Sequence, residues 1–239
     1  MNILKDILKI KKLSLIIFIV PLVAVNLCLI IVTHFGEYLA IGDPLGSLSF
    51  PYIDGKASIS RTARVFPSYL IFKPAMIFTG IVLIKYWNSN FRLINFLDTN
   101  NNFKKYFRFF GVASAVFLIL HSIFLGFKFD ADLYKFFRRF ILLSFIIFEL
   151  VAQAILVINL NKIKNNIERL IQKKILILKI ALVSTLIIVA LITIPFLNSS
   201  DHTNLKHALE WNYLLGILLF YLLNYFFWKK PRSHTLSGM

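Results

Sequence analysis

The chain has 239 residues, of which 58% are hydrophobic, 15% are aromatic and 16% are charged. Because a soluble domain carries about a quarter charged residues, this composition excludes an ordinary soluble protein and indicates a polytopic membrane protein. A formal net charge of +16 would suggest nucleic-acid binding if the basic residues shared one soluble face, but their placement along the chain excludes that partner. The one cysteine, Cys28, lies in an apolar run, so there is no disulfide framework and no cysteine zinc site.

Six apolar segments follow one another along the chain, each about 20 residues or longer and therefore long enough to cross a bilayer as a helix. The first follows the basic start "MNILKDILKIKK". It is too long for the core of a signal peptide and no cleavage site follows it, so it is expected to be an uncleaved helix. We predict an all-α fold, a single six-helix transmembrane domain over residues 1–239, with helices at about 13–34, 66–87, 107–127, 136–160, 175–197 and 207–228.

The distribution of charge along the chain predicts the orientation. Most Lys and Arg residues lie before the first segment, around the second and fourth connections, and in the tail. Lys179 is counted here with the residues that flank the fourth connection. Acidic residues lie mostly around the other connections. The positive-inside rule then places both termini in the cytoplasm, with six crossings.

The first connection, residues 35–65, is the one sizeable external segment. It is rich in Gly, Ser and Pro and contains the only long stretch that is not expected to be helical. It is too short for an independent domain, so we expect it to fold over the helix bundle.

The candidate ionisable residues inside the apolar segments are Lys73, His121, Glu149 and Glu210. Such groups are costly in a membrane and usually face a bundle interior or an aqueous cavity. Most lie in the external half, whereas Glu149 is closer to the midplane. For two of these residues a purely structural role is the alternative. Lys73 could form a stabilising ion pair with Glu149 or Glu210, and His121 could be a hydrogen-bonded histidine inside the bundle.

Helical spacing places these polar residues on particular faces. In the fourth segment, Glu149 shares a face with Gln153 and Arg138. Arg138 and its neighbour Arg139 suit either headgroup binding or simple anchoring at the interface. In the sixth segment one stripe combines Glu210, Tyr213, Ile217, Tyr221 and Asn224. The polar stripes are best satisfied if they converge inside the bundle.

The sequence lacks the motifs of several common kinds of active site. It contains no Gly-rich phosphate loop, no HExxH and no GxSxG. His34 and Glu37 are three residues apart, a spacing too unspecific for a metal site. We therefore predict no metal site and no cofactor. Glu210 and His121 are the candidates for an acid–base pair, and no nucleophile is identified.

Two stretches resemble the Frag/DRAM/Sfk membrane-protein family, which includes damage-regulated autophagy modulators and proteins that remodel GPI-anchor lipids. "FPYIDGKASISRTARVF", residues 50–66, is similar to the P-[YS]-I-S-[DA] motif of the first external loop, although the Ser before the aspartate is missing. "HALEWNYLLGILLFYLLNYFF", residues 207–227, is similar to the small-x-Glu-Trp/Tyr start of the sixth helix. The residues that carry the resemblance are Pro51, Tyr52, Ile53, Asp54, Glu210 and Trp211.

In line with what the resemblance implies, the first hypothesis is a protein that binds, organises or remodels a phospholipid or glycolipid. Basic side chains would contact phosphate, and acidic ones would orient them or accept sugar hydroxyls. The membrane lipid is then the expected partner. The candidate ligand-binding residues are Asp54, Arg64, Lys73, His121, Arg138, Arg139, Glu149, Glu210 and Trp211.

Two alternatives belong to other classes. A small proton-coupled transporter would use Lys73, Glu149 and Glu210 as a relay, but it needs a polar route on the cytoplasmic side of Glu149. A structural or assembly subunit would pair its polar stripes with a membrane-protein partner. The location is a bacterial inner membrane or a eukaryotic endomembrane or plasma membrane, because the Ile, Lys and Asn bias of the chain suits both.

Overall fold

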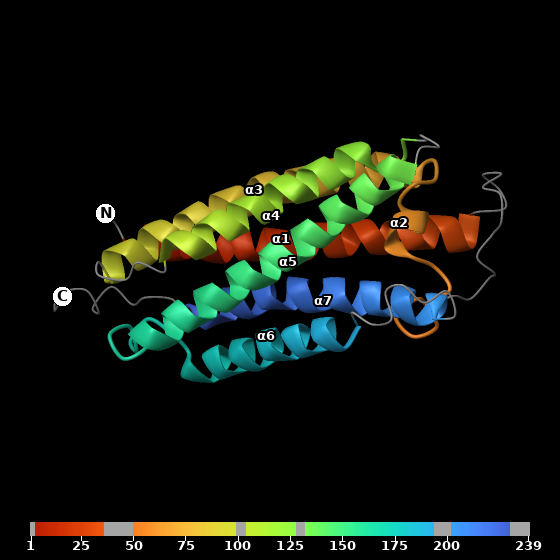
Figure 1. Ribbon diagram of the computed structural model, residues 1–239. Coiled ribbons are helices and arrows are strands. Elements are labelled where there is room, and N and C mark those ends of the chain that lie inside the picture. Colours follow the sequence, from red (N-terminus) through yellow and green to blue (C-terminus); the bar gives the residue numbers. More distant parts are fainter. Residues whose placement is uncertain (1–2, 36–49, 99–103, 128–131, 194–201, 230–239) are drawn as a thin grey trace.

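The computed structural model describes residues 3–35, 50–98, 104–127, 132–193 and 202–229. Within these ranges the secondary structure is helical, apart from one isolated β-bridge between Ile171 and Trp228. Figure 1 shows an elongated bundle in which the long helices lie side by side. The helices are α1 (Ile3–Phe35), α2 (Ile59–Thr62), α3 (Ser68–Leu97), α4 (Lys104–Phe124), α5 (Asp132–Ile163), α6 (Lys173–Thr193) and α7 (Thr203–Phe227).

The bundle has two distinct ends. At the terminal end, α1 begins and α7 ends, beside the connections from α3 to α4 and from α5 to α6 (Figure 1). Lys11 Nζ donates to the Trp228 carbonyl there, at 2.6 Å, which ties the two termini of the bundle together. At the other end, called the α2 end below, the short helix α2 lies close to the beginnings of α5 and α7. Consecutive long helices therefore alternate in direction.

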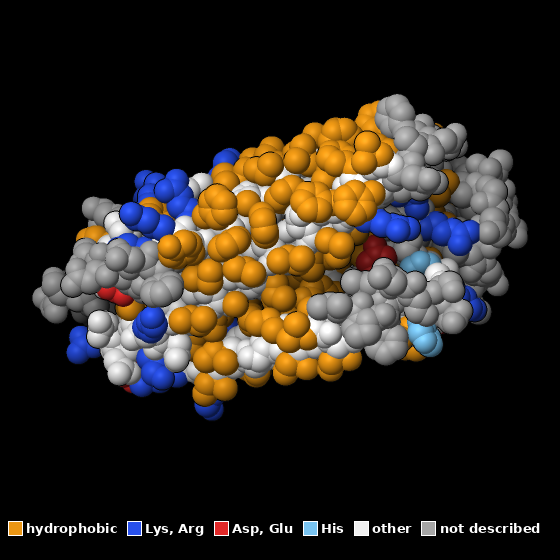
Figure 2. All heavy atoms as spheres, in the orientation of Figure 1, with side chains coloured by type: hydrophobic (Ala, Val, Ile, Leu, Met, Phe, Trp, Pro, Cys, Tyr) orange, Lys and Arg blue, Asp and Glu red, His pale blue; other side chains and the backbone are white. Residues whose placement is uncertain are grey.

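Five helices, α1, α3, α4, α5 and α6, contain a stretch long and apolar enough to cross a membrane. Figure 2 shows a broad hydrophobic band between two ends that carry basic side chains. On α6, large apolar side chains such as Ile188 and Leu191 are 56% and 62% exposed. Apolar surface on this scale is unfavourable in water and suits contact with lipid. These features are those of a multi-pass integral membrane protein.

Helix α7 is not among these five, although at 25 residues it runs along the bundle with the others. It packs against α1 and α6, and its face toward the bundle carries the polar stripe predicted above. Ile217, Tyr221 and Asn224 on this stripe are buried. Polar side chains on the buried face lower the mean hydropathy of α7 without exposing those groups to lipid.

Close packing of α3 on α4 depends on a small residue. A Cβ atom added at Gly111 would lie 2.3 Å from the indole of Trp87, which is fully buried. Small residues at such crossings let transmembrane helices approach closely. Helix α4 packs against both α3 and α5.

Several helices extend beyond the apolar segments that the sequence defines. Helix α1 begins at Ile3 and α3 continues to Leu97, because basic and polar residues continue the helix beyond the apolar stretch. The predicted first loop is described from residue 50 onward, and its part at residues 36–49 lies outside the described residues. The described part contains the single turn of helix α2, which the composition did not predict.

Candidate functional site

The described part of the first loop lies against the beginning of α7. Trp211 Nε1 donates to the Ala57 carbonyl at 2.9 Å, and Asn212 Nδ2 donates to the Tyr52 carbonyl at 2.7 Å. The centres of the Tyr52 and Trp211 rings are 5.0 Å apart. The two stretches that carry the family resemblance, far apart in sequence, therefore contact each other directly.

Asp54 and Gly55 shape the turn that makes this contact possible. The Asp54 carboxylate accepts hydrogen bonds from the backbone N–H groups of Phe50 and Lys56, at 2.8 and 2.9 Å. Gly55 has a φ of +60°, and a Cβ atom there would lie 1.7 Å from the Asn204 carbonyl oxygen. Only glycine fits this position. Asp54 was predicted to bind a ligand, but the hydrogen bonds named here stabilise the loop itself.

Glu210 connects α7 to the short helix α2. Its carboxylate lies close to the backbone N–H groups of Ile59 and Ser60, the first two residues of α2. These N–H groups have no partner within the helix, and a negative charge is favourable at a helix N-terminus. The contact with this loop therefore explains in part why a carboxylate lies near the start of an otherwise apolar helix.

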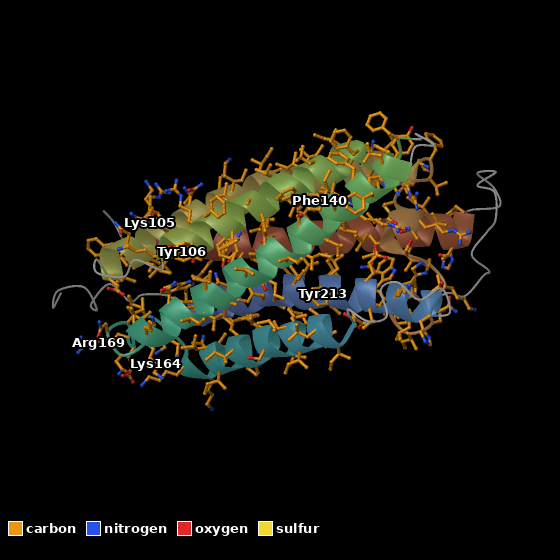
Figure 3. The ribbon with its side chains drawn as sticks, viewed as in Figure 1. Lys105, Tyr106, Phe140, Lys164, Arg169 and Tyr213 are labelled. Carbon is orange, nitrogen blue, oxygen red and sulfur yellow. The ribbon has the colours of Figure 1, made fainter. Side chains whose placement is uncertain are left out.

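A cavity of about 90 Å³ lies beside Glu210, between α5 and α7 near the α2 end. Its walls are mostly apolar side chains from α1, α3, α4, α5 and α7, such as Phe145 and Ile217. Polar side chains enter it from Ser60, His121 and Glu210. Figure 3 labels Tyr213, which lines the cavity from α7, and Phe140 on the neighbouring part of α5.

His121 is the polar group in this cavity that most needs a partner. Its side chain is 7% exposed, and its Nδ1 has no hydrogen-bond partner among the described residues. A buried polar atom without a partner is unfavourable. The structure thus brings together the two predicted acid–base candidates, His121 and Glu210, as walls of one cavity.

Two arginines lie close to this cavity. Burial and the nearby Arg138 cation lower the pKa of Arg64, against the opposing effect of the Glu210 carboxylate. Arg64 Nε donates to the Ser60 carbonyl at 2.8 Å, and the Arg138 guanidinium lies 5.9 Å from the ring of Tyr134. Figure 2 shows basic side chains next to acidic and histidine side chains near the α2 end. Two neighbouring cations beside this cavity create a site that attracts an anion.

The remaining basic candidates lie elsewhere. Lys73 donates to the Ile123 carbonyl at 3.4 Å, and its Nζ lies 5.1 Å from the centre of the Phe127 ring. Among the described residues it makes no ion pair with Glu149 or Glu210, so the structural pairing that the sequence left open is not formed. The long lysine stem carries the ammonium toward the end of α4 instead. Arg139 is exposed on α5.

Glu149 belongs to a second polar cluster, which we call the core cluster, in the middle of the bundle. Its carboxylate accepts hydrogen bonds from Ser114 Oγ at 2.6 Å, from Gln153 Nε2 at 3.0 Å and from the Tyr221 hydroxyl. All four side chains are buried. The donors come from α4, α5 and α7, so one carboxylate ties three helices together.

The core cluster continues toward the terminal end through Lys179, a residue that we did not expect inside the bundle. Lys179 is fully buried, donates to Asn224 Oδ1 at 2.7 Å and lies 4.2 Å from the centre of the Phe220 ring. Asn224 Nδ2 in turn donates to Ser14 Oγ at 3.0 Å. Placing Lys179 among the residues that flank the loop was therefore wrong. Its position one turn inside the apolar run "ILILKIALV" was the available signal.

Comparison with models of protein families, with curated proteins and with solved structures finds no match to this chain. The site is therefore interpreted from its own geometry. It combines a loop fixed on α7, a cavity lined by Glu210 and His121, and two arginines beside it.

Proposed function

We propose that this membrane protein binds a phospholipid or glycolipid at the α2 end. The phosphate would contact Arg64 and Arg138, and the apolar part of the molecule would enter the cavity between α5 and α7. The observation that carries this proposal is the combination of two neighbouring cations with an apolar cavity, because an amphiphile needs both. The Glu210 carboxylate would then accept hydrogen bonds from hydroxyl groups of the headgroup, and His121 would donate to one of its ester oxygens.

We further propose six membrane crossings with both termini in the cytoplasm, so that the α2 end is external. Helix α7 supports this, since its 25 residues span about 37 Å. Figure 3 also supports it, because Lys105, Lys164 and Arg169 all lie at the terminal end, where the positive-inside rule expects them.

The orientation can be tested with single cysteines. Cys28 is buried and is the one cysteine of the chain, so a Cys28→Ala chain gives a clean background. A membrane-impermeant maleimide applied to intact cells is expected to label Lys56→Cys and to leave Lys164→Cys unlabelled until the membrane is opened. The reverse pattern would overturn the orientation.

We also propose membership of the Frag/DRAM/Sfk family. Its support is that residues 50–62, within the first matching stretch, pack on the start of the second. Two short motifs that contact each other act as one structural unit, which chance similarity of separate segments does not require.

Lipid binding is tested by native mass spectrometry of the purified protein together with lipid analysis of a deletion strain. The unmodified chain is expected to retain a phosphate-bearing lipid, and Arg64→Ala/Arg138→Ala is expected to lose it by roughly tenfold. Lys164→Ala/Arg169→Ala removes the same charge at the opposite end and serves as the control. Equal retention by all three chains, with no lipid change on deletion, would overturn the proposal.

Whether the bound lipid is also converted is decided by incubation with the purified protein. If Glu210 and His121 act as an acid–base pair, a lipid product accumulates with time and disappears in both Glu210→Gln and His121→Phe. A protein that only binds or organises lipid retains it unchanged.

A second candidate function, proton-coupled transport, is favoured by the core cluster. The polar route that it needs on the cytoplasmic side of Glu149 would use the side chains of Lys179, Ser14 and Tyr86, which are buried in the bundle. Tyr86 Oη and Gln153 Oε1 have no hydrogen-bond partner within the described residues, and a void of about 30 Å³ touches Glu149. Proton flux in proteoliposomes that disappears in Glu149→Gln would establish this function; no flux above empty vesicles would exclude it.

A further inference from the structure

A second amphiphilic site lies at the terminal end, on the outer face of α3 and α4. It is a groove of about 550 Å³ whose lining includes the side chains of Asn88, Phe91, Lys105, Arg108, Phe109 and Val112. No part of the proposed lipid site reaches it. On α4, Arg108 and His121 are separated by about 20 Å at 1.5 Å per residue.

The cations in this groove are held on one helix face. Lys105 and Arg108 are three residues apart in the first turns of α4, so their side chains are neighbours. Arg108 Nε donates to Asn88 Oδ1 at 2.8 Å, and its guanidinium lies 4.9 Å from the centre of the Phe91 ring. These two contacts from α3 fix the guanidinium, which keeps further N–H donors in a planar fork suited to phosphate.

The remaining lining of the groove is apolar. Phe109 is 64% exposed, although it is a large aromatic side chain. Val112 lies about 10 Å further along α4 from Lys105. The groove is therefore basic at its outer edge and apolar toward the middle of the bundle, which is the polarity of a phospholipid lying along the protein surface.

We propose that this groove binds an anionic phospholipid of the surrounding leaflet, with its phosphate at Arg108 and Lys105 and an acyl chain along Phe109 and Val112. Two cations, with no acidic residue among the described residues that line the groove, favour a lipid with net negative charge over a zwitterionic one. Basic pockets between transmembrane helices at the cytoplasmic side recognise anionic headgroups in this way. The inference is independent of the lipid site at the α2 end.

The test is native mass spectrometry of the full chain, titrated with phosphatidylglycerol and with phosphatidylcholine of the same acyl chains. The unmodified protein is expected to bind phosphatidylglycerol preferentially, and Lys105→Ala/Arg108→Ala is expected to reduce that preference roughly tenfold. Lys164→Ala/Arg169→Ala removes the same charge at the same end but outside the groove (Figure 3) and is expected to keep the preference. Loss of the preference in both double variants would show general charge attraction and overturn the proposal, as would its survival in Lys105→Ala/Arg108→Ala.

Two further arms complete the test. Lys105 is exposed, so Lys105→Ala alone should fold normally and show part of the loss; an unchanged preference would contradict the proposal. Glycerol phosphate, a headgroup without chains, is expected not to displace the lipid, since the apolar part of the groove contributes to binding; displacement would show a site for free phosphate instead. Arg64→Ala/Arg138→Ala is expected to keep this second bound lipid, which separates failure here from failure at the α2 end.

Discussion

Glu149 and Glu210 both lie on helix faces that turn into the bundle, and their surroundings differ. Glu149 receives hydrogen bonds from side chains of three helices, with a void of about 30 Å³ beside it. Glu210 lies beside the first backbone N–H groups of the loop helix α2 and faces a cavity of about 90 Å³. The same residue type thus joins helices in one place and supports a binding cavity in the other. The presence of a carboxylate inside a helix bundle does not distinguish these two roles. The groups that surround each carboxylate distinguish them.

The largest effect on stability is expected from Glu149→Leu. It leaves the donors of Ser114, Gln153 and Tyr221 without their acceptor inside the bundle, and we expect a loss of about 2 kcal/mol in the free energy of unfolding. Glu149→Gln retains an acceptor oxygen and should lose less. Thermal unfolding in detergent measures both. A larger loss for Glu210→Leu than for Glu149→Leu would reverse the comparison.

Gly55→Ala should disturb the α2 end alone. The left-handed backbone at this position and the close approach to the Asn204 carbonyl mean that the methyl group of alanine destabilises the folded state by about 1–2 kcal/mol. The loop is expected to move away from α7 to relieve this strain. Hydrogen exchange should rise across residues 50–62 and stay unchanged around Glu149. Uniformly faster exchange in both regions would mean that the loop and the core unfold together.

His121→Phe should stabilise the protein while weakening lipid retention. It removes a buried nitrogen without a partner and fills part of the cavity, so the unfolding temperature should rise by a few degrees, corresponding to roughly 0.5–1 kcal/mol. Leu118→Phe, a control that fills the same cavity without removing a polar group, should weaken retention as well. Lower stability together with full lipid retention in His121→Phe would show that the histidine is structural.

The smallest effect is expected from Glu168→Gln in the turn between α5 and α6. Glu168 makes an exposed ion pair with Lys173 at 2.7 Å, and the hydrogen bond and charge of Lys173 lower the pKa of the carboxyl. A lowered pKa in the folded state stabilises the protein above the unfolded pKa of the carboxyl, an effect lost as the pH falls through the folded value. Because the pair is solvated, thermal unfolding at neutral pH and physiological salt should not change measurably. A clear shift would show that charges at the terminal end matter for stability.

The sequence predicts a good part of this structure. Apolar length identified the long helices, and the 3.6-residue period placed Tyr221 and Asn224 on the buried face of α7 and Gln153 beside Glu149. These features are local, because they depend on the spacing of residues within one helix.

What the sequence did not predict depends on tertiary contacts. Lys73 lies in an apolar helix like Lys179, yet the first extends to the end of α4 while the second is buried against Asn224. Periodicity defines the face of a residue but not what lies opposite. The path of the loop over α7, and hence the partners of Glu210, depends on one turn at Gly55 that no helical pattern indicates.

An experimental density map of the protein in lipid nanodiscs tests the central claim most directly. The account predicts a headgroup within hydrogen-bond distance of Arg64 and Arg138, with a chain entering the cavity between α5 and α7. A cavity that holds only water or closes on itself, with both arginines turned to solvent, would contradict it.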